Sequence, residues 1–329
     1  MEKFFEKIWY KKYSYYLIIL LPISFLFLLI IKIRIFLYKN NILKKYESKV
    51  PVLIVGNISV GGSGKTPFVI WLANYLTQKN LNVGIVSSGY KSSSCKAMFV
   101  DRHSDPRMVG DEAVIFAHKT SCNIVSGGNR VEANKLLISK NVYDLIIHDD
   151  GLQHYKLKRD YEIILVNSHI LFGNQLMLPA GPLREPISRL SQADITAYSN
   201  SIDKDIYAIA SINNSIKNLD SGNIKKIKDF SYKKIHLVTG IASTDEIIST
   251  LNNNKIQYIM HKYDDHHTYN GNEIIFDDDL PVFITYKDYV KLSKIKNKKI
   301  WIIEHTIEPN KLFMDKITTD LSALLHYEK

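Results

Sequence analysis

The sequence contains only two cysteines among its 329 residues. Cys95 and Cys122 lie far apart and form no CxxC pair, so neither a disulfide framework nor a zinc site is indicated. A reducing compartment fits this usage best. The chain also lacks low-complexity tracts, internal repeats and an aromatic-basic nucleic-acid-binding motif. These absences argue against extended disorder and against a nucleic-acid partner.

Apolar and basic residues are plentiful. The hydrophobic fraction of 46% supports a real core, and the length predicts two globular units. The net charge of +10 and the pI near 9.2 suggest anionic partners such as phospholipid headgroups or a phosphorylated substrate. A general bias toward Lys, Asn and Ile explains the same charge equally well, so charge alone does not identify a partner.

An apolar run covers residues 17–31 and is interrupted only by Pro22 and Ser24. Aromatic and basic residues flank it on both sides, as is typical of a segment at a membrane interface. A signal peptide is a rival interpretation, but no small-residue cleavage site follows. A buried helix of a soluble domain is the other alternative. We expect a membrane helix that dips into or crosses the bilayer.

From Val50 onwards, short apolar runs alternate with amphipathic stretches. We expect strands at 52–55, 83–87, 123–125, 145–147, 163–166, 195–198, 236–239, 256–259, 282–285 and 301–303. We expect helices at 67–79, 111–119, 130–139 and 244–252. This alternation predicts an α/β fold with a parallel sheet covered on both faces. The expected organisation is a membrane-anchoring segment at 1–45, a core domain at 46–200 and a smaller α/β domain at 201–329.

The strongest chemical signal is the glycine-rich segment 56–66, which follows one expected strand and precedes a helix. Such a loop binds phosphate oxygens through its backbone N–H groups and the helix N-terminus. Lys65 would reach the β- and γ-phosphates of a nucleotide, and the Thr66 hydroxyl would bind magnesium. The residues expected to cradle the nucleotide are Gly61, Gly62, Ser63, Gly64, Lys65 and Thr66.

The loop departs from the usual G-x-x-x-x-G-K-[ST] pattern because Ser59 occupies the first glycine position. It is closer to the GGxGKT variant of partitioning-type ATPases, but Val60 replaces their additional lysine. A glycine-rich turn with a chance Lys-Thr pair is the alternative. The strand–loop–helix setting favours a P-loop NTPase-like core.

Two carboxylates follow the expected strand at 145–147. Asp149 and Asp150 would lie at the carboxyl edge of a parallel sheet, beside the phosphate loop, where magnesium needs them. An acidic turn without a metal is the alternative. Three other polar clusters, at 110–112, 178–186 and 265–267, are equally compatible with structural and functional roles.

Together these segments resemble the tetraacyldisaccharide 4'-kinase family, which phosphorylates the lipid A precursor. The resemblance extends from the N-terminal apolar segment to about residue 291. It rests on the loop at 56–67 and on the motifs at 110–112, 149–154, 172–174, 178–185, 239–242, 265–266 and 285–288. The Asp-Asp-Gly-Leu-Gln-His and Pro-Ala-Gly-Pro-Leu-Arg-Glu strings are the most specific of these.

The resemblance implies an enzyme that transfers the γ-phosphoryl group of ATP to the 4'-hydroxyl of tetraacyldisaccharide 1-phosphate. It implies ATP and Mg²⁺ as cofactors, and a bacterial inner-membrane location with the catalytic domains on the cytoplasmic face. The lipid-linked disaccharide 1-phosphate and inner-membrane phospholipid are the implied partners. A membrane-associated ATPase switch of the partitioning type is the alternative function.

The resemblance also implies roles for individual residues. Asp111 and His266 would form a catalytic pair, with His267 as the local competitor of His266. Lys65 and Thr66 would hold ATP and magnesium, and Asp149 and Asp150 the metal and nearby waters. Residues expected to contact the phosphates or the disaccharide are Tyr90, Arg130, His154, Arg184 and Glu185.

Two positions depart from the family pattern. Ser88 stands where the family usually has a substrate-facing arginine, and Tyr286 stands in place of a glutamate in the motif at 285–288. The first departure puts the details of sugar-phosphate contact in question. Neither affects the expected ATP chemistry.

Overall fold

The computed structural model describes residues 8–10, 16–90, 92–94, 96–241, 244–265, 267–292 and 297–325. Its α-helices are α2 (Tyr16–Lys39), α3 (Lys65–Gln78), α4 (Pro106–Val109), α5 (Asp111–Lys119), α6 (Arg130–Ile138), α7 (Asp245–Asn253), α8 (Tyr286–Tyr289) and α9 (Lys311–Leu325). Short 3-10 helices are η1 (Ile187–Gln192), η2 (Ile227–Phe230) and η3 (Asn272–Ile274).

The first strands are β1 (Val52–Gly56), β2 (Val83–Ser87), β3 (Met98–Val100), β4 (Asn123–Ser126), β5 (Leu145–Asp149), β6 (Tyr161–Asn167) and β7 (Ile195–Ser199). The others are β8 (Ala208–Asn218), β9 (Ile224–Lys226), β10 (Lys234–Thr239), β11 (Gln257–Lys262), β12 (Val282–Thr285) and β13 (Ile300–Pro309). All expected strands and helices are present. The α/β class with a mainly parallel sheet is therefore confirmed.

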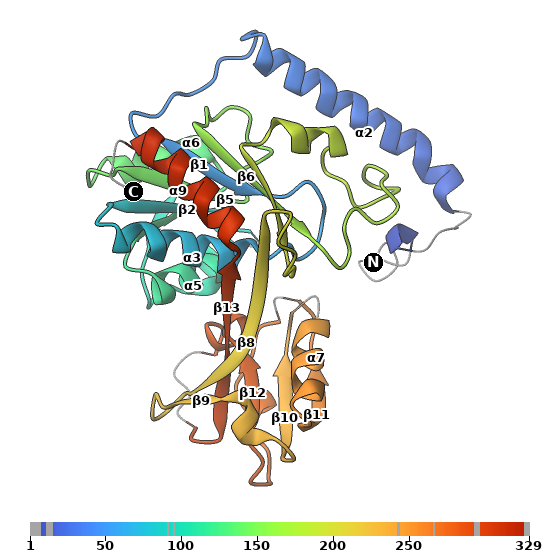
Figure 1. Ribbon diagram of the computed structural model, residues 1–329, viewed down its shortest axis with the longest axis vertical. Helices are drawn as coiled ribbons and strands as arrows, with labels where there is room; N and C mark the ends of the chain where they lie inside the picture. Colours follow the sequence, from blue (N-terminus) through green and yellow to red (C-terminus); the bar gives the residue numbers. More distant parts are fainter. Residues whose placement is uncertain are drawn as a thin grey trace.

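All the strands of the described residues belong to one 13-stranded sheet in the order β11-β10-β12-β13-β8-β7-β6-β1-β5-β2-β4-β3, with β9 paired to β8. Neighbours are parallel except at β13–β8, β8–β9 and β3–β4. Figure 1 shows two lobes joined by the long strands β8 and β13. The first lobe holds β1–β7 and the second holds β9–β12.

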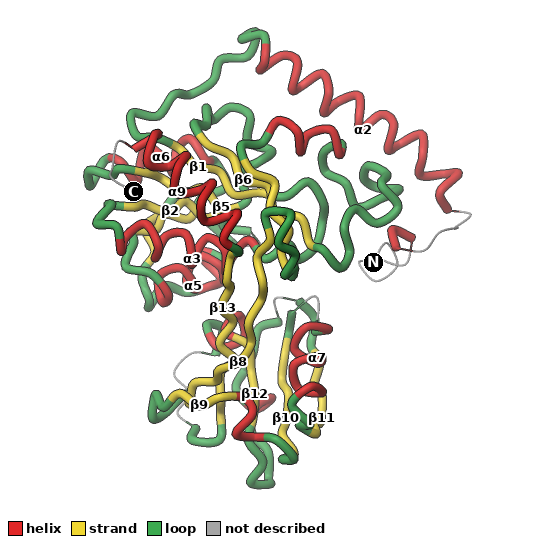
Figure 2. The backbone as a smooth tube through the Cα atoms, viewed as in Figure 1, coloured by secondary structure: helices red, strands yellow, loops and turns green. Residues whose placement is uncertain are grey.

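The antiparallel pairing of β8 with β13 determines which edges of the two lobes face each other. The strands β7, β6, β1, β5, β2 and β4 run in the direction of β8, toward the second lobe. The strands β12, β10 and β11 run in the direction of β13, toward the first lobe. The carboxyl edges of both parallel sets therefore face the junction between the lobes, which the strands β8 and β13 cross (Figure 2). Ligands bind at such edges in open α/β sheets.

The C-terminal helix α9 falls within the range expected for the second domain, 201–329, but it lies in the first lobe. β13 carries the chain back to the first lobe, and α9 then packs there. Its apolar face buries Phe313, Ile317 and Leu321 in the same core as Phe68 of α3. Burial of such side chains contributes roughly 1.5–3 kcal/mol each. The segment assigned in sequence to 201–329 thus supplies the first lobe with a helix.

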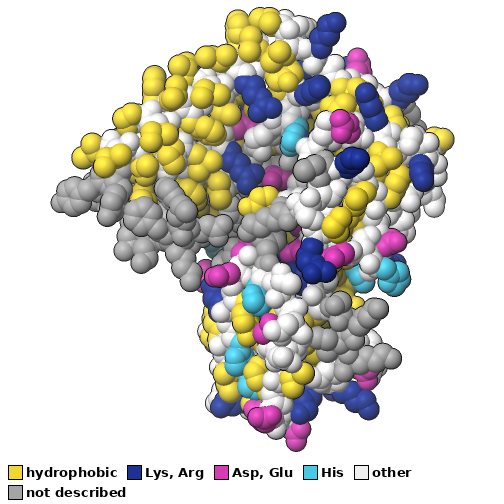
Figure 3. Space-filling view, turned by 180° about the vertical axis from the view of Figure 1, so that it is seen from behind, with side chains coloured by type: hydrophobic (Ala, Val, Ile, Leu, Met, Phe, Trp, Pro, Cys, Tyr) yellow, Lys and Arg dark blue, Asp and Glu magenta, His cyan; other side chains and the backbone are white. Residues whose placement is uncertain are grey.

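The N-terminal helix α2 lies along the outside of the first lobe (Figure 1). It is the one helix among the described residues that is long and apolar enough to cross a membrane. Its inner face contacts the first lobe through Phe27 and Leu28, and the Ser24 hydroxyl accepts a 2.9 Å hydrogen bond from the Ala180 N–H. Its outer face is exposed, and hydrophobic side chains cover this part of the surface (Figure 3).

Candidate active site

The phosphate loop connects β1 to α3 as expected. Helix α3 begins at Lys65, two residues earlier than the sequence indicated, so the lysine and Thr66 form its first turn. Gly61 and Gly64 have φ angles of 117° and 75°. These left-handed conformations favour glycine because other residues meet steric strain there. The loop consequently wraps around the N-terminus of α3, where N–H groups are free to bind an anion.

The proline-rich segment 178–186 holds this loop in place. The Val60 N–H donates to the Pro182 carbonyl at 2.8 Å, and the Arg184 N–H donates to the Ile58 carbonyl at 2.7 Å. On the other side, the Asn167 side chain donates to the Gly62 carbonyl at 2.8 Å. The segment therefore acts as a backbone clamp on the phosphate loop.

The acidic turn lies beside the phosphate loop because β1 and β5 are parallel neighbours, with Val55 in register with Asp149. The Lys65 Nζ atom is 3.6 Å from an Asp150 carboxylate oxygen, and an Arg184 nitrogen is 3.2 Å from that carboxylate. Burial raises the pKa of Asp150, but Lys65 and Arg184 outweigh it and lower the value to about 2. Asp150 is therefore ionised and paired with two cationic side chains.

Asp149 differs from its neighbour in having an unpartnered oxygen. Its side chain is 1% exposed, and its Oδ1 atom has no hydrogen-bond partner among the described residues. Burial, followed by the charges of Glu112 and Asp150, raises the pKa of Asp149 to about 8. A buried carboxylate without its own cation is suited to a divalent metal.

Thr66 and Asp149 fit the expected magnesium ion because both offer hard oxygen ligands. No group of three or more His, Cys, Asp and Glu side chains able to hold a metal occurs in the described part of the chain. Magnesium bound with a nucleotide usually takes only one or two carboxylates and completes its shell with phosphate oxygens and water. Asp150 remains a predicted ligand, but Lys65 and Arg184 already neutralise it.

The pH dependence of the melting temperature, measured without metal, should reveal the raised pKa of Asp149. Its pKa is about 8 in the folded protein, against an ordinary aspartate value of 3.8. Between these values the folded state holds a proton that the unfolded state has lost, so stability falls as pH rises. Asp149→Asn cannot ionise. Its melting temperature relative to the unsubstituted chain should rise from about pH 5 to about pH 8 and then level off.

This comparison requires EDTA and no nucleotide, because a bound cation would stabilise the ionised form. Titrating groups far from Asp149 are the same in both proteins and cancel in the difference, whereas the interactions of Asp149 with Glu112 and Asp150 are part of the measured effect. A melting difference that stays constant between about pH 5 and about pH 9 would contradict the raised pKa.

Arg130 and His154 lie close to the acidic turn. Arg130 is 2% exposed, and its NH2 group donates to the backbone carbonyls of Asp149 and Asp150. Its Nε and NH1 atoms have no partner among the described residues. Burial, then Arg130 and Arg34, lower the pKa of His154 to about 4. His154 is therefore neutral at neutral pH. Arg130 stabilises the acidic turn through its bonds to the two backbone carbonyls.

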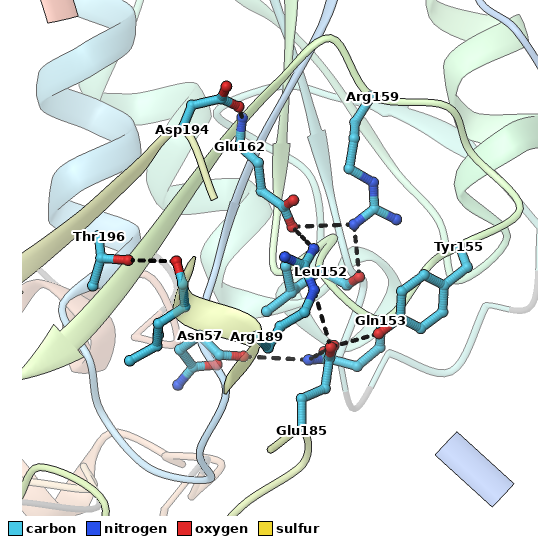
Figure 4. A network of polar contacts seen from close by, with 11 residues as sticks. Asn57, Leu152, Gln153, Tyr155, Arg159, Glu162, Glu185, Arg189, Asp194 and Thr196 are labelled. Atoms are coloured by element: carbon cyan, nitrogen blue, oxygen red, sulfur yellow. Dashed lines mark hydrogen bonds and ion pairs between the residues drawn. The ribbon is translucent and has the colours of Figure 1, made fainter. Parts of the chain in front are cut away.

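Glu185, which was expected to contact the phosphates or the disaccharide, has a fully buried side chain. It accepts hydrogen bonds from the Tyr155 hydroxyl and from Gln153, and it forms an ion pair with Arg189 (Figure 4). Arg189 also binds Glu162. Glu185 thus fixes the segment 178–186 to the protein interior, while its neighbour Arg184 faces the acidic turn.

The N-terminus of α5 reaches the same edge of the sheet. Asp111 is 8% exposed and is the first residue of the helix, after Gly110 with a φ angle of 89°. A side chain at Gly110 would lie 3.3–3.4 Å from the backbone of Gly89 and Tyr90, so the two turns touch. Ser88, in place of the family arginine, uses its hydroxyl to accept the Tyr90 N–H at 3.1 Å. The departure therefore stabilises the turn locally.

The opposite wall comes from the carboxyl edge of the second lobe. Asp288 is fully buried and accepts hydrogen bonds from the Gly240 N–H and the Tyr269 hydroxyl, both at 2.9 Å. Lys287 binds Asp265 at 3.0 Å. The motif at 285–288 therefore fixes the loops that follow β10 and β11. This gives the resemblance at 265–266 and 285–288 a common structural basis.

The expected catalytic residue His266 lies outside the described residues, so its pairing with Asp111 remains a prediction. The competitor His267 already has partners within the second lobe. Its Nε2 atom is 3.4 Å from a Glu273 oxygen, and its ring stacks on Tyr263 with centroids 4.6 Å apart.

Tyr286, the second departure from the family pattern, makes a contact between the lobes. Its ring packs edge-on against His118 of α5, and the Lys119 ammonium lies 4.0 Å from the ring centroid. Lys119 also pairs with Glu304 of β13. A tyrosine at this position therefore connects α8 to the last turn of α5 by ring and cation–π contacts.

Sequence reasoning missed two asparagines at the phosphate loop. Asn57 donates to the Ser59 carbonyl at 2.6 Å, and its own carbonyl accepts from Gln153 at 3.2 Å. Asn167, at the end of β6, binds the loop at Gly62. Asn57 directly follows β1, and Asn167 is the last residue of β6; both strands are parallel members of the sheet. The rule that located Asp149 at a strand end would have selected them as well.

Comparison with known proteins decides the family. The family model described as Tetraacyldisaccharide-1-P 4'-kinase matches residues 16–322. The chain belongs to the tetraacyldisaccharide 4'-kinase family. A tetraacyldisaccharide 4'-kinase of Pasteurella multocida is 40% identical over 90% of this chain and 91% of the relative. The corresponding protein of Nitrosococcus oceani is 37% identical over 87% of this chain and 85% of the relative.

A solved structure agrees with the tetraacyldisaccharide 4'-kinase assignment. The crystal structure of LpxK from Aquifex aeolicus in complex with ATP has a TM-score of 0.76 and 26% identity. It covers 93% of this chain and 98% of the other. The resemblance inferred from the motifs and the P-loop kinase fold are therefore confirmed. The partitioning-type ATPase interpretation gains no support from these matches.

Proposed function

We propose that this chain transfers the γ-phosphoryl group of ATP to the 4'-hydroxyl of tetraacyldisaccharide 1-phosphate, a step of lipid A biosynthesis. Family membership over residues 16–322 supports the activity. The observation in this chain that carries it is the contact of 3.6 Å between the Lys65 ammonium and Asp150, at the adjoining ends of α3 and β5. This contact places the phosphate loop, a cation and the acidic turn in one site.

The residues of the first lobe would position and neutralise the transferred group. Backbone N–H groups at 61–66 bind phosphate oxygens, and Lys65 exchanges its contact with Asp150 for the β- and γ-phosphates. Arg184, in the segment 178–186, would likewise exchange its contact with Asp150 for a phosphate. Thr66 and Asp149 would hold magnesium, which supplies charge neutralisation for the phosphates when it is bound. Positioning and electrostatics account for most of the catalysis of phosphoryl transfer.

Asp111 would orient the acceptor hydroxyl and accept its proton, with His266 orienting the carboxylate. Supporting this proposal, Asp111 begins a helix at the carboxyl edge of the first lobe, and residues 265 and 267 flank His266 at the opposing edge of the second. The two edges face each other because of the antiparallel β8–β13 pair. Closure of the lobes would bring the pair together and exclude water.

The activity is tested by supplying the detergent-solubilised full chain with labelled ATP and a defined acceptor. Label should pass to tetraacyldisaccharide 1-phosphate and not to an analogue that lacks the 4'-hydroxyl. Rapid ATP hydrolysis that does not depend on the acceptor, with no labelled lipid, would instead identify a partitioning-type switch. Absence of both reactions would overturn the nucleotide site as well.

We further place the chain at the bacterial inner membrane with both lobes on the cytoplasmic side. The exposed apolar face of α2 supports membrane attachment, while its inner face is occupied by the first lobe. A helix held along one side by a soluble lobe fits partial immersion in the bilayer better than free spanning. The cytoplasmic side is supported because ATP, the proposed phosphoryl donor, is available in the cytoplasm.

Charged substitutions on the outer face of α2 should release the protein from membranes. Ile18, Phe25 and Leu29 are 73%, 69% and 44% exposed. Glutamates at these positions should each cost on the order of 2 kcal/mol or more of insertion free energy. The triple variant should move from the membrane pellet to the soluble fraction. Deleting the residues before Tyr38 should do the same, but it also uncovers the surface beneath Phe27.

A matched control carries three glutamates at exposed apolar positions outside α2. Val142, Ile202 and Ile224 are 85%, 86% and 69% exposed. Their substitution changes the net charge equally and should leave the protein in the membrane pellet. Equal membrane binding of the two triple variants would place the anchor elsewhere.

A further inference from the structure

A cavity of about 210 Å³ opens where α2 ends and the first lobe begins. Half of its ten lining residues are basic, and none is acidic. The basic lining residues are Lys39, Lys45, Lys158, Arg159 and Arg189. A second cavity of about 410 Å³ shares Lys45 and Lys158 with the first and adds Lys44. The hollow therefore has a strongly positive lining.

Arg189 is the most buried of these basic residues and has an unused donor. The residue is 6% exposed. Its NH2 group binds Glu162, and its Nε group binds Glu185 at 3.3 Å. Its NH1 atom has no hydrogen-bond partner among the described residues. Because a buried guanidinium donor without a partner is costly, an acceptor from outside the protein would satisfy it.

The charge balance leaves the cavity an excess of cations. Arg159 and Arg189 are offset by the two buried glutamates, Glu162 and Glu185 (Figure 4). Lys158 is offset by Glu47, which lines the second cavity.

Lys39, Lys44 and Lys45 form no ion pair with any described residue. A ligand with one or two negative charges fits this surplus.

The location indicates where such a ligand comes from. Tyr38, at the end of α2, stacks near Tyr155 with ring centroids 6.2 Å apart and forms one wall of the cavity. The apolar outer face of α2 leads directly to this end, where Lys39 closes the helix. A molecule with acyl chains beside α2 would place its headgroup at the cavity.

We propose that this cavity binds the phosphate of an anionic membrane phospholipid, with Arg189, Lys39 and Lys45 as its donors. The proposal rests on the membrane attachment proposed above, and it adds a specific lipid site to the general apolar anchor. None of the lining residues belongs to the phosphate loop or to the acidic turn. The occupant of the cavity is therefore a structural lipid rather than the phosphoryl acceptor.

Gln192 offers a test that leaves the buried network intact. It is exposed and lines the cavity. Gln192→Glu places a carboxylate there, while Gln257→Glu makes the same charge change on β11 in the second lobe. Flotation with phosphatidylcholine vesicles containing increasing phosphatidylglycerol measures binding by the full chain. Gln192→Glu should weaken the phosphatidylglycerol-dependent part about fivefold, and Lys39→Ala/Lys45→Ala about twentyfold. Gln257→Glu should match the unsubstituted chain.

Two further arms separate the possible outcomes. Equal losses in Gln192→Glu and Gln257→Glu would mean diffuse attraction and would overturn the site. Inorganic phosphate or glycerol phosphate that raises the melting temperature of the unsubstituted chain, but not of Gln192→Glu, would overturn a lipid as the source. Binding to pure phosphatidylcholine vesicles tests the α2 anchor separately, and kinase activity in detergent tests the proposed function. Gln192→Glu should change neither.

Discussion

Lys65→Ala is expected to lower kinase turnover by about a hundredfold or more, because the site loses the cation that faces the transferred phosphate. The ammonium lies at the start of α3 and already contacts Asp150 at 3.6 Å. Removing it leaves Arg184 as the described ion-pair partner of that carboxylate. The pKa of Asp150 should therefore rise toward its ordinary range.

Turnover must be compared in a folded protein. Lys65 is partly exposed and contributes no apolar packing to the core, so the melting profile should remain close to that of the unsubstituted chain. Lys79→Ala, just after the end of α3, provides a control with the same loss of charge. Near-normal turnover in Lys65→Ala with a native melting profile would contradict the phosphate-loop assignment.

Asp111→Ala and His266→Ala should each reduce turnover by about a hundredfold to ten-thousandfold, the usual contribution of a positioned acid–base group. If His266 works only by orienting the Asp111 carboxylate, each substitution disables the same unit. The double variant should then cost little more than the worse single one. The measurement is turnover at saturating ATP and acceptor, for both singles and the double.

His267→Ala is the matched control for this cycle. His267 contacts Glu273 and Tyr263 and is expected to support the loop rather than the chemistry. Its substitution should affect stability more than turnover. Fully additive losses from Asp111→Ala and His266→Ala, or a greater loss of turnover from His267→Ala than from His266→Ala, would show that the pairing is wrong.

Local pattern was enough to predict much of the first lobe. Strand–loop–helix order around 56–66 and the carboxylates after the strand at 145–147 depend on short-range periodicity and backbone chemistry. These segments appear as β1, α3 and β5. Their proximity followed from one rule, that parallel strands share a carboxyl edge. Lys65 and Asp150 lie together for that reason.

Other features were not readable from local pattern. The polar, weakly alternating strand β8 was not predicted, because its stability comes from pairing with β13 on one side and β7 on the other. Helix α9 is amphipathic, but only the path of β13 decides that it packs on the first lobe. Glu185 and Arg184 are neighbours in one motif, yet one is buried and the other faces the site.

The sequence by itself determined the phosphate loop, the acidic turn, the apolar N-terminal helix and, through its motifs, the family. These properties depend on residues close together in the chain, whose spacing and side-chain chemistry limit what they can form. Tertiary structure alone decided that the two carboxyl edges face each other, that Asp149 and not Asp150 keeps an open oxygen, and that Arg189 retains an unused donor beside α2. Each of these depends on which distant segments exclude water from a given atom and which charges they bring beside it.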